Sequence, residues 1–368
     1  MIPVNEPSIG EQEMAYVREC LETGWISSAG QFIDRFETEF AAYCGMKHGV
    51  AVANGTAALE LAVASLGIGA GDEIIMPTFT IISCAQAAVY NGATPVLVDS
   101  DPDTWCMDVS QVEAKITPRT RAVMPVHIYG HPVDMDPLRD LAEAHDLLII
   151  EDAAEAHGAK YRGRRCGGLG DMSCFSFYAN KIITTGEGGM VLTNDDDVAE
   201  IARSKRNLCF QSQRRFYHTE LGYNFRLTNL QAALGVAQLE RIDEIVARKI
   251  EVGRAYTRGL SGLPLQLPVE REWADNVYWM YGVVLDDSTG LDATEFARLL
   301  AEKGVQTRPF FLGMHEQPAL WDRGLFVGER YPVAERLARK GLYLPSGTAL
   351  TDEQIGETIA AVSEVLGR

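Results

Sequence analysis

The stretch DMSCFSFYANKIITTGEGGM, residues 171–190, decides which fold we expect. Its apolar and aromatic part, residues 173–178, is short enough for a buried strand, and the pattern breaks at Ala179 and Asn180, directly before Lys181. Most lysines at such positions are solvated, because lysine is rarely buried without a partner. A lysine desolvated at a strand end instead has a lowered pKa, and its neutral amine can attack a carbonyl. The glycine-rich run that follows indicates a tight turn or a close approach between chain segments.

Strands and helices alternate around this stretch. Two amphipathic helices are predicted over residues 11–23 and 31–44, and from residue 49 onward short apolar strands alternate with helices. This alternation is typical of an α/β domain with a mostly parallel sheet, whose ligands lie beyond the carboxyl ends of the strands.

The length of 368 residues exceeds what one hydrophobic core usually serves, so we expect two domains. A long helical pattern over residues 228–260, with Thr228 as its N-cap, is expected to bridge them. Further elements follow it, namely strands within 277–285 and 304–309 and helices at 292–303, 332–340 and 352–366. We therefore predict a large α/β domain over residues 1–245 and a smaller C-terminal α+β domain over residues 246–368.

Composition and charge disfavour several classes of protein. The formal net charge of −18 disfavours nonspecific nucleic-acid binding. The seven cysteines are scattered singly, with no CxxC pair and an odd total, so we expect neither a disulfide framework nor a metal site. No apolar run approaches the ~20 residues of a membrane span, and the first residues do not resemble a signal peptide. We expect a cytoplasmic protein with no membrane partner.

One segment contrasts with this acidic background. Residues 203–226 carry a net charge near +5, with Glu220 as the single acid among the basic residues Arg203, Lys205, Arg206, Arg214, Arg215 and Arg226. The segment is either a solvated basic face or a binding region for an anionic ligand.

The motif NGTAAL, residues 54–59, turns from a strand into a helix at Gly55 and Thr56. The unpaired amides of a helix's first turn carry a partial positive charge, and Gly55 lets an anion approach closely. A phosphate therefore suits this turn, although Thr56 is also an ordinary helix cap.

The motif IIEDAAEAHG, residues 149–158, places Glu151 and Asp152 at the end of a strand so apolar that it must be buried. A pyridinium nitrogen is one partner for Asp152, which would keep such a ring protonated and electron-withdrawing. The alternative is that Asp152 caps the next helix. In the neighbouring FSF motif, Ser176 can offer its hydroxyl to a phosphate if strand alternation turns Phe175 and Phe177 the other way.

Taken together, these motifs and GYNFRLTNLQAALG at residues 222–235 occur in the order and at the separations of a known group. The sequence resembles the DegT/DnrJ/EryC1/StrS sugar aminotransferases over nearly its whole length. The resemblance implies the aspartate aminotransferase-like fold, fold type I, and pyridoxal 5′-phosphate as cofactor. A related branch of dehydratases has His at the position of Lys181, so the lysine favours amino-group transfer.

Site residues follow from the resemblance position by position. It implies that Lys181 binds the cofactor covalently and acts in catalysis with Asp152, which pairs with the ring nitrogen. The other cofactor-binding residues that it implies are Glu155 near the ring's 3-hydroxyl, Gly55, Thr56 and Ser176 at the phosphate, Ile81 at the ring face, and Asn224 from the neighbouring subunit. A homodimer with shared active sites is therefore expected.

The substrate side is also inferred from the resemblance. Arg308 and His315 in TRPFFLGMH are expected near the substrate, and Arg226, in the basic segment, near a nucleotide's pyrophosphate. The motifs TGWISSAG, PVHIYGHPVDMDP and NKIITTGEGGM look most like those of the branch that aminates C4 of a GDP-linked 4-keto-6-deoxy sugar with L-glutamate as donor. A UDP- or dTDP-linked keto-sugar remains the alternative substrate, and a cofactor-binding regulatory protein the alternative class.

One position departs from the family pattern. Relatives usually have an aromatic residue where the segment PTFTIIS has Ile81. Either an aliphatic side chain covers the cofactor ring or Phe79 reaches it. Loss of the aromatic contact would cost about 1 kcal/mol in cofactor binding.

Overall fold

The computed structural model describes residues 1–211 and 213–367. Its central sheet has seven strands, β1 (His48–Val52), β2 (Glu73–Pro77), β3 (Thr94–Val98), β4 (Thr120–Val123), β5 (Leu148–Asp152), β8 (Met172–Ser176) and β9 (Gly189–Thr193). They lie in the order β1-β9-β8-β5-β4-β2-β3. Strand β9 runs antiparallel to both of its neighbours, and all other neighbouring pairs are parallel. The mixed, mostly parallel sheet predicted from the sequence is confirmed.

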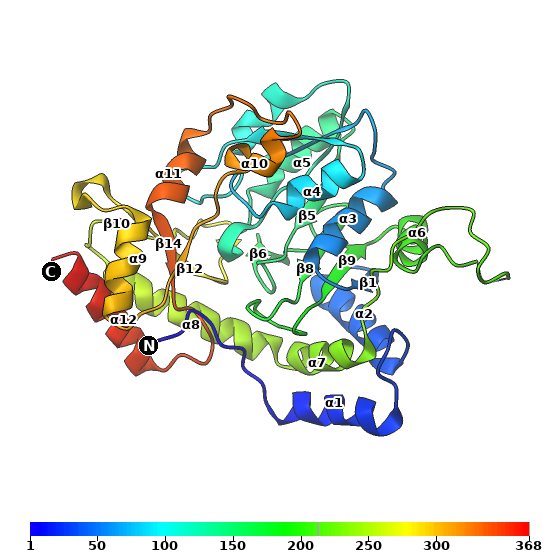
Figure 1. Ribbon diagram of the computed structural model, residues 1–368, viewed down its shortest axis with the longest axis horizontal. Helices are drawn as coiled ribbons and strands as arrows, with labels where there is room; N and C mark the ends of the chain where they lie inside the picture. Colours follow the sequence, from blue (N-terminus) through cyan, green and yellow to red (C-terminus); the bar gives the residue numbers. More distant parts are fainter. Residues whose placement is uncertain (212, 368) are drawn as a thin grey trace.

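Helices pack around this sheet (Figure 1). They are α1 (Glu11–Thr23), α2 (Gln31–Cys44), α3 (Gly55–Ser65), α4 (Ser83–Tyr90), α5 (Met135–Ala144), α6 (Asp196–Arg206) and α7 (Asn229–Glu240). The first two begin and end where the sequence predicts. Helix α3 packs against β8, β9 and β1, which brings its first turn to the carboxyl end of β8.

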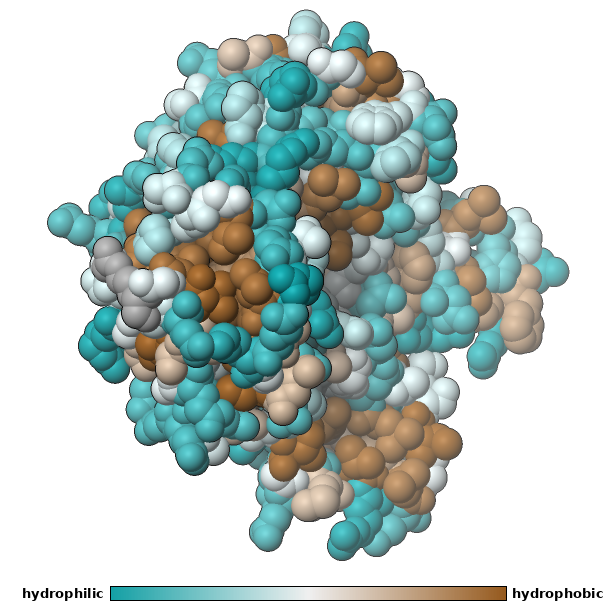
Figure 2. All heavy atoms as spheres, turned by 60° about the vertical axis from the view of Figure 1, so that its left-hand side comes forward, coloured by the Kyte–Doolittle hydropathy of each residue, from teal (hydrophilic) through white to brown (hydrophobic). Residues whose placement is uncertain are grey.

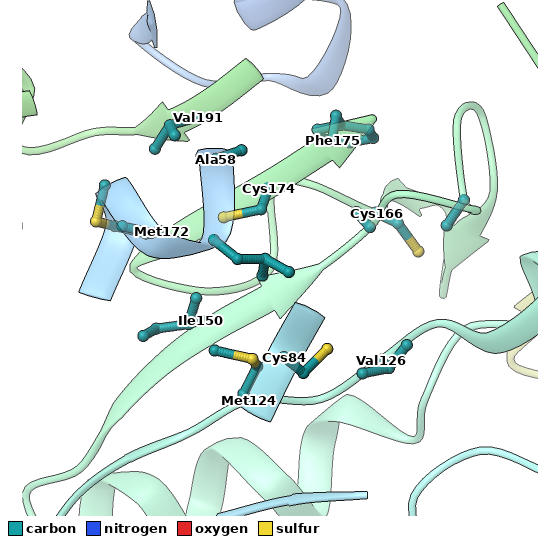
Figure 3. Packing of buried hydrophobic residues seen from close by; sticks show 14 of the residues in the cluster. Ala58, Cys84, Met124, Val126, Ile150, Cys166, Met172, Cys174, Phe175 and Val191 are labelled. Atoms are coloured by element: carbon teal, nitrogen blue, oxygen red, sulfur yellow. The ribbon is translucent and has the colours of Figure 1, made fainter. Parts of the chain in front are cut away.

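Strand β8 owes its position to side chains on both of its faces. Phe175 packs edge-on against Phe40 of α2 with ring centroids 4.8 Å apart, and Phe177 lies 4.9 Å from Phe36 one helical turn away. Burying each of these rings stabilises the fold by about 1.5–3 kcal/mol. Side chains on the other face meet α3 and α4, as Figure 3 shows for Cys174, Ala58 and Cys84. Because side chains alternate along a strand, Ser176 faces away from the phenylalanines, so the condition for its contact with a phosphate is met.

A second sheet lies beside the first. It has four antiparallel strands in the order β10-β12-β14-β13, and the N and C termini both lie near it (Figure 1). Its elements are β10 (Leu265–Gln266), β12 (Tyr281–Leu285), β13 (Arg308–Pro309) and β14 (Gly341–Leu344), with helices α8 (Ile242–Leu260), α9 (Ala293–Glu302), α10 (Pro318–Trp321), α11 (Pro332–Lys340) and α12 (Asp352–Val365). A small three-stranded sheet joins β6 (Lys160–Tyr161), β7 (Arg164–Arg165) and β11 (Ala274–Asp275).

Helix α8 contributes to two separate apolar clusters. Ile242 and Ile245 belong to the core around the large sheet, whereas Val252, Tyr256 and Leu260 belong to the core of the second sheet. The helix therefore spans both cores, in line with its expected bridging role. The domain boundary at residues 245 and 246 stays a prediction.

The single helix predicted over residues 228–260 is two helices. Thr228 caps α7 as expected, since its side chain accepts a hydrogen bond from the Gln231 amide, but the helical backbone is interrupted at Arg241, whose φ is −120° and ψ is 19°. The side chain of Arg241 bonds Ser8 and pairs with Glu13 at 3.1 Å. These contacts accompany the break, and the local helical pattern does not reveal them.

The strand predicted within residues 277–285 is also shorter than expected. It begins only at Tyr281, because Tyr278 has a φ of 49° and donates its amide to the Asn276 side chain. Strand β13 likewise covers just Arg308 and Pro309 of the range 304–309. Across the residues that the structure describes, we find no helix that combines the length and apolarity needed to cross a membrane.

Candidate active site

A cavity of about 650 Å³ opens at the carboxyl ends of the strands of the large sheet. Segments following β1, β2, β5 and β8 supply its walls, and its volume lies within the range of small-molecule sites. The predicted residues that line it are Gly55, Thr56, Ile81, Asp152, Glu155, Ser176 and Lys181. Residues separated by more than 120 positions in the sequence therefore meet where the motifs indicated.

Lys181 lies in the turn after β8, and its side chain is only 11% exposed. Its Nζ is 3.7 Å from Glu155 Oε1 and 3.8 Å from the centre of the Trp279 ring. Burial lowers the pKa of this amine, against the opposing effect of the Glu155 and Asp152 carboxylates. The desolvated lysine, rather than the solvated alternative, is therefore the arrangement observed.

Glu155 faces the same amine from the loop after β5. Its Oε2 accepts a hydrogen bond of 2.7 Å from the Tyr129 amide. Burial raises the pKa of this carboxyl to about 7, although Lys181 and the Tyr129 amide both favour the charged form. Glu155 can therefore take up or release a proton near neutral pH beside Lys181.

Asp152 ends β5 and is 3% exposed. Its Oδ2 accepts from the Cys84 thiol at 3.1 Å, and its Oδ1 accepts from the Ala154 amide at 3.1 Å. Burial raises the pKa of Cys84, so this cysteine remains a protonated donor. Residues 153–158 form turns rather than a helix, so Asp152 does not cap one.

The preceding carboxylate, Glu151, has a structural environment of its own. It is fully buried and accepts hydrogen bonds from the amides of Gly167, Leu169 and Gly170 and from Ser173 Oγ, with His127 Nε2 at 3.0 Å. These hydrogen bonds and the charge interaction with His127 lower its pKa below the ordinary value despite burial. Glu151 therefore supports the loop at residues 167–170 and does not line the cavity.

The first turn of α3 forms a cradle that a side chain would fill. A Cβ at Gly55 would lie 2.7 Å from Ser176 Cβ, and the Asn54 side chain caps the helix through the Ala57 amide. Thr56 Oγ1 lies 2.7 Å from Ser83 Oγ, and both residues line the cavity with Ser176. A helix N-terminus with several hydroxyl groups nearby is a donor set that suits a phosphate. The glycine run at 186–189 approaches the same turn, since a Cβ at Gly189 would lie 2.4 Å from the Asn54 carbonyl.

Pyridoxal phosphate fits these residues. The cradle at α3 suits its phosphate, the buried carboxylate of Asp152 suits a protonated ring nitrogen, and Lys181 presents a desolvated amine. Ile81 lines the cavity, whereas Phe79 is buried against Phe310 and Phe311 and does not. Of the two alternatives, Ile81 rather than Phe79 therefore reaches the cavity.

Four predicted residues do not line the cavity of their own chain. Asn224 is exposed, and Arg226 donates to the Asn207 side chain at 2.8 Å. Arg308 is exposed on β13. His315 is buried, with Nδ1 2.8 Å from Thr78 Oγ1 and Nε2 3.4 Å from Glu335. Their roles stay predictions.

Sequence reasoning missed the aromatic side chains of the cavity, namely Tyr178, Phe225, Trp279, Phe311 and Tyr343. Trp279 and Tyr343 belong to the smaller sheet region and reach the cavity only through tertiary packing. The aromatic density of VYWMYG at 277–282 was a signal, but it is equally typical of a core strand.

Comparison with known proteins agrees with this geometry. The model of the DegT/DnrJ/EryC1/StrS aminotransferase family matches residues 7–363. A relative from Caulobacter vibrioides named GDP-perosamine synthase is 46% identical over 99% of this chain and 98% of its own. Relatives with the same name from Escherichia coli O157:H7 and Vibrio cholerae are 42% and 41% identical, with at least 97% of each chain covered.

Solved structures of relatives indicate the same cofactor. The Streptomyces venezuelae protein DesV, solved in complex with a ketimine intermediate, is 40% identical with a TM-score of 0.89 over 97% of this chain and 94% of its own. A sugar aminotransferase described as putative, from Streptococcus pneumoniae in its PMP form, is 26% identical with a TM-score of 0.93 over 100% of this chain and 99% of its own. The chain therefore belongs to the DegT/DnrJ/EryC1/StrS aminotransferase family and is a pyridoxal-phosphate-dependent aminotransferase.

Proposed function

We propose that this aminotransferase is a GDP-perosamine synthase, which transfers the amino group of L-glutamate to C4 of GDP-4-keto-6-deoxy-D-mannose. Identity of 46% with the Caulobacter relative of that name, over nearly the full length, is the observation that carries this proposal. The motifs TGWISSAG and PVHIYGHPVDMDP, which resemble those of the same branch, support it.

The side chains of the cavity have distinct roles in this reaction. Bound pyridoxal phosphate supplies an electron-accepting ring and a carbon that carries the amino group between the two substrates. Lys181 Nζ would anchor the cofactor and, once released, would take the proton from Cα of glutamate and later return a proton at C4 of the sugar. The Asp152 carboxylate holds the proton on the ring nitrogen, with Cys84 and Ala154 fixing its two oxygens.

The remaining residues bind and orient. The first-turn amides at Gly55 and the hydroxyls of Thr56 and Ser176, which line the cavity, would bind the phosphate. Glu155, beside Lys181, would exchange a proton near neutral pH and would lie near the cofactor's 3-hydroxyl. Ile81 excludes water from the face of the ring.

We further propose a homodimer whose active sites are shared, because the cavity of one chain lacks the charge that its ligands need. Its lining residues include the acids Glu60, Asp152, Glu155 and Glu187 but only one cation, Lys181, among the described residues. Phosphate, glutamate and a nucleotide diphosphate are all anions. Cationic groups from a second chain would supply the missing charge.

The segment with net charge near +5, residues 203–226, is our candidate for that contribution. It leaves the body of the molecule after α6 (Figure 1), and Phe216 and Leu221 in it are 76% and 94% exposed. We propose that Asn224 binds the phosphate of the cofactor in the partner subunit's active site. We propose that Arg226 binds the pyrophosphate of the nucleotide sugar there. Met14, Leu21, Trp25 and Ile26, on and after α1, are large apolar residues that are exposed. Figure 2 shows that apolar residues gather in patches on the surface, and patches of this kind suit a dimer interface.

A cytoplasmic location is part of the same proposal. All seven cysteines are free and buried, which suits a reducing compartment.

A product assay tests the substrate. Purified protein with pyridoxal phosphate and L-glutamate is incubated separately with GDP-4-keto-6-deoxy-D-mannose and with UDP- and dTDP-linked keto-sugars, and the amino sugars are identified by mass spectrometry. We expect turnover with the GDP sugar at least tenfold faster than with the others. Turnover of a dTDP sugar alone would contradict the substrate assignment, and an unchanged cofactor spectrum after glutamate addition would indicate a regulatory protein.

A further inference from the structure

Trp279 lies directly against the reactive lysine although it comes from the segment before β12. It is 4% exposed, and its ring centre is 3.8 Å from Lys181 Nζ. Its indole N–H donates a 2.7 Å hydrogen bond to the carbonyl of Asn180. One side chain therefore contacts both the amine and the peptide that precedes it.

The backbone of Trp279 is itself held from behind by a buried lysine. Lys249 of α8 is 3% exposed, and its Nζ donates to the Trp279 carbonyl at 2.6 Å and to the Ser346 carbonyl. No carboxylate pairs with Lys249 among the residues that the structure describes, and burial lowers its pKa to about 7. Lys249 therefore links the backbone carbonyls of Trp279 and Ser346.

The face of an indole ring attracts a cation, and this attraction is strongest in a desolvated site. Burial disfavours the charged form of Lys181, so Trp279 opposes that effect together with the nearby carboxylates. The charge of Lys181 also acts on His157, but burial chiefly lowers the pKa of that imidazole to about 3, so it is neutral. The remaining ionisable groups lining the two cavities around Lys181 are Glu60, Asp152, Tyr178, Glu187, Tyr343, Glu6 and Lys249.

We infer that Trp279 is a positioning residue for Lys181. Its ring holds the free ε-amine against the cavity wall beside Glu155, its N–H fixes the turn that carries the lysine, and Lys249 fixes Trp279. The inference rests on the proposed role of Lys181 in the reaction. The lysine must leave the cofactor and bind it again in each half-reaction. Both steps are faster if the free amine stays close to its reactive position.

The test measures the titration of Lys181 in cofactor-free protein. Trace acetylation with acetic anhydride across a pH series, followed by mass spectrometry of the peptide that contains Lys181, reports the fraction of neutral amine. For Trp279→Leu we expect the midpoint to fall by about one pH unit, a tenfold change in the ratio of the two forms. Trp279→Phe keeps an aromatic face, so its midpoint should fall by no more than half as much as that of Trp279→Leu.

Trp105→Leu is the matched control. Trp105 is 3% exposed, as buried as Trp279, but it does not line the cavity. This variant should leave the Lys181 midpoint unchanged. The inference would be overturned if wild type and Trp279→Leu had equal midpoints. It would also be overturned if Trp279→Leu and Trp279→Phe shifted the midpoint equally, because a residue that only fills space would affect Lys181 alike in both variants.

A second measurement covers the case in which Trp279→Leu does not fold. Replacing all five tryptophans with 5,7-difluorotryptophan weakens the ring's negative face with little change in shape. The Lys181 midpoint should fall by a smaller amount than in the Leu variant, and an unchanged midpoint would contradict the inference. Because both measurements use cofactor-free protein, they stand apart from the proposed function, which fails if Lys181→Ala still binds the cofactor covalently.

Discussion

Substituting Gly55 with Ala tests the phosphate cradle by steric means. The new Cβ would lie 2.7 Å from Ser176 Cβ and 3.3 Å from Ser176 Cα, closer than packed carbon atoms tolerate. Because α3 and β8 pack against each other, their separation must grow by several tenths of an ångström. The first-turn amides then move away from the phosphate.

Two opposing terms set the expected magnitude. Ala is favoured over Gly within a helix by about 0.5–1 kcal/mol, and overpacking costs about 1–3 kcal/mol. The cofactor-free protein should therefore lose at most about 2.5 kcal/mol of unfolding free energy. Loss of one hydrogen bond to a charged phosphate, at about 1.5–3 kcal/mol, should weaken cofactor binding by about 10- to 150-fold.

The assay is a cofactor titration followed by the visible absorbance of the lysine-bound cofactor, with urea unfolding of the cofactor-free protein alongside. Gly356→Ala is the control, because Gly356 lies within α12 and its added Cβ would meet nothing within 4 Å. That variant should gain about 1 kcal/mol in stability and bind the cofactor normally. Wild-type cofactor affinity in Gly55→Ala would refute the cradle.

Three further predictions follow from the same contacts. Glu155 has a pKa of about 7, above that of an unfolded glutamate, so the folded protein binds the extra proton and loses stability as pH rises from about 4.5 to 7. Urea unfolding at pH 5 and pH 8 should show this loss in wild type but not in Glu155→Gln, and an equal change in the two proteins would contradict the prediction. Cys84→Ala removes the thiol donor to Asp152 and should lower kcat by about tenfold, whereas Cys84→Ser keeps a donor and should lower it less; equal rates in steady-state assays would show that the thiol does not matter. If active sites are shared, mixing the inactive variants Asn224→Ala and Lys181→Ala should restore activity in heterodimers, and no recovery after subunit exchange would argue for independent sites.

Local patterns predicted the large sheet and most of the site. The apolar strand ending before Lys181, the carboxylate ending the strand at Asp152 and the glycine turn at Gly55 are each set by neighbours in the sequence. Parallel strands then bring their carboxyl ends to one edge, so the meeting of these residues follows from the fold class. The resemblance to the family supplied their roles.

Tertiary contacts account for what the sequence did not predict. The helix breaks at Arg241 where its side chain binds Ser8 and Glu13, more than 220 positions away. Trp279 reaches Lys181 because a turn at Tyr278 interrupts the expected strand. Neither effect leaves a periodicity in the local sequence.

The covalent role of Lys181 is the central claim, and a mass measurement tests it most directly. The protein is loaded with pyridoxal phosphate, reduced with borohydride and digested, and each lysine-containing peptide is weighed. We predict that the reduced cofactor adds its mass to the peptide carrying Lys181 and to no other. Modification of a different lysine, or of none, would contradict the account.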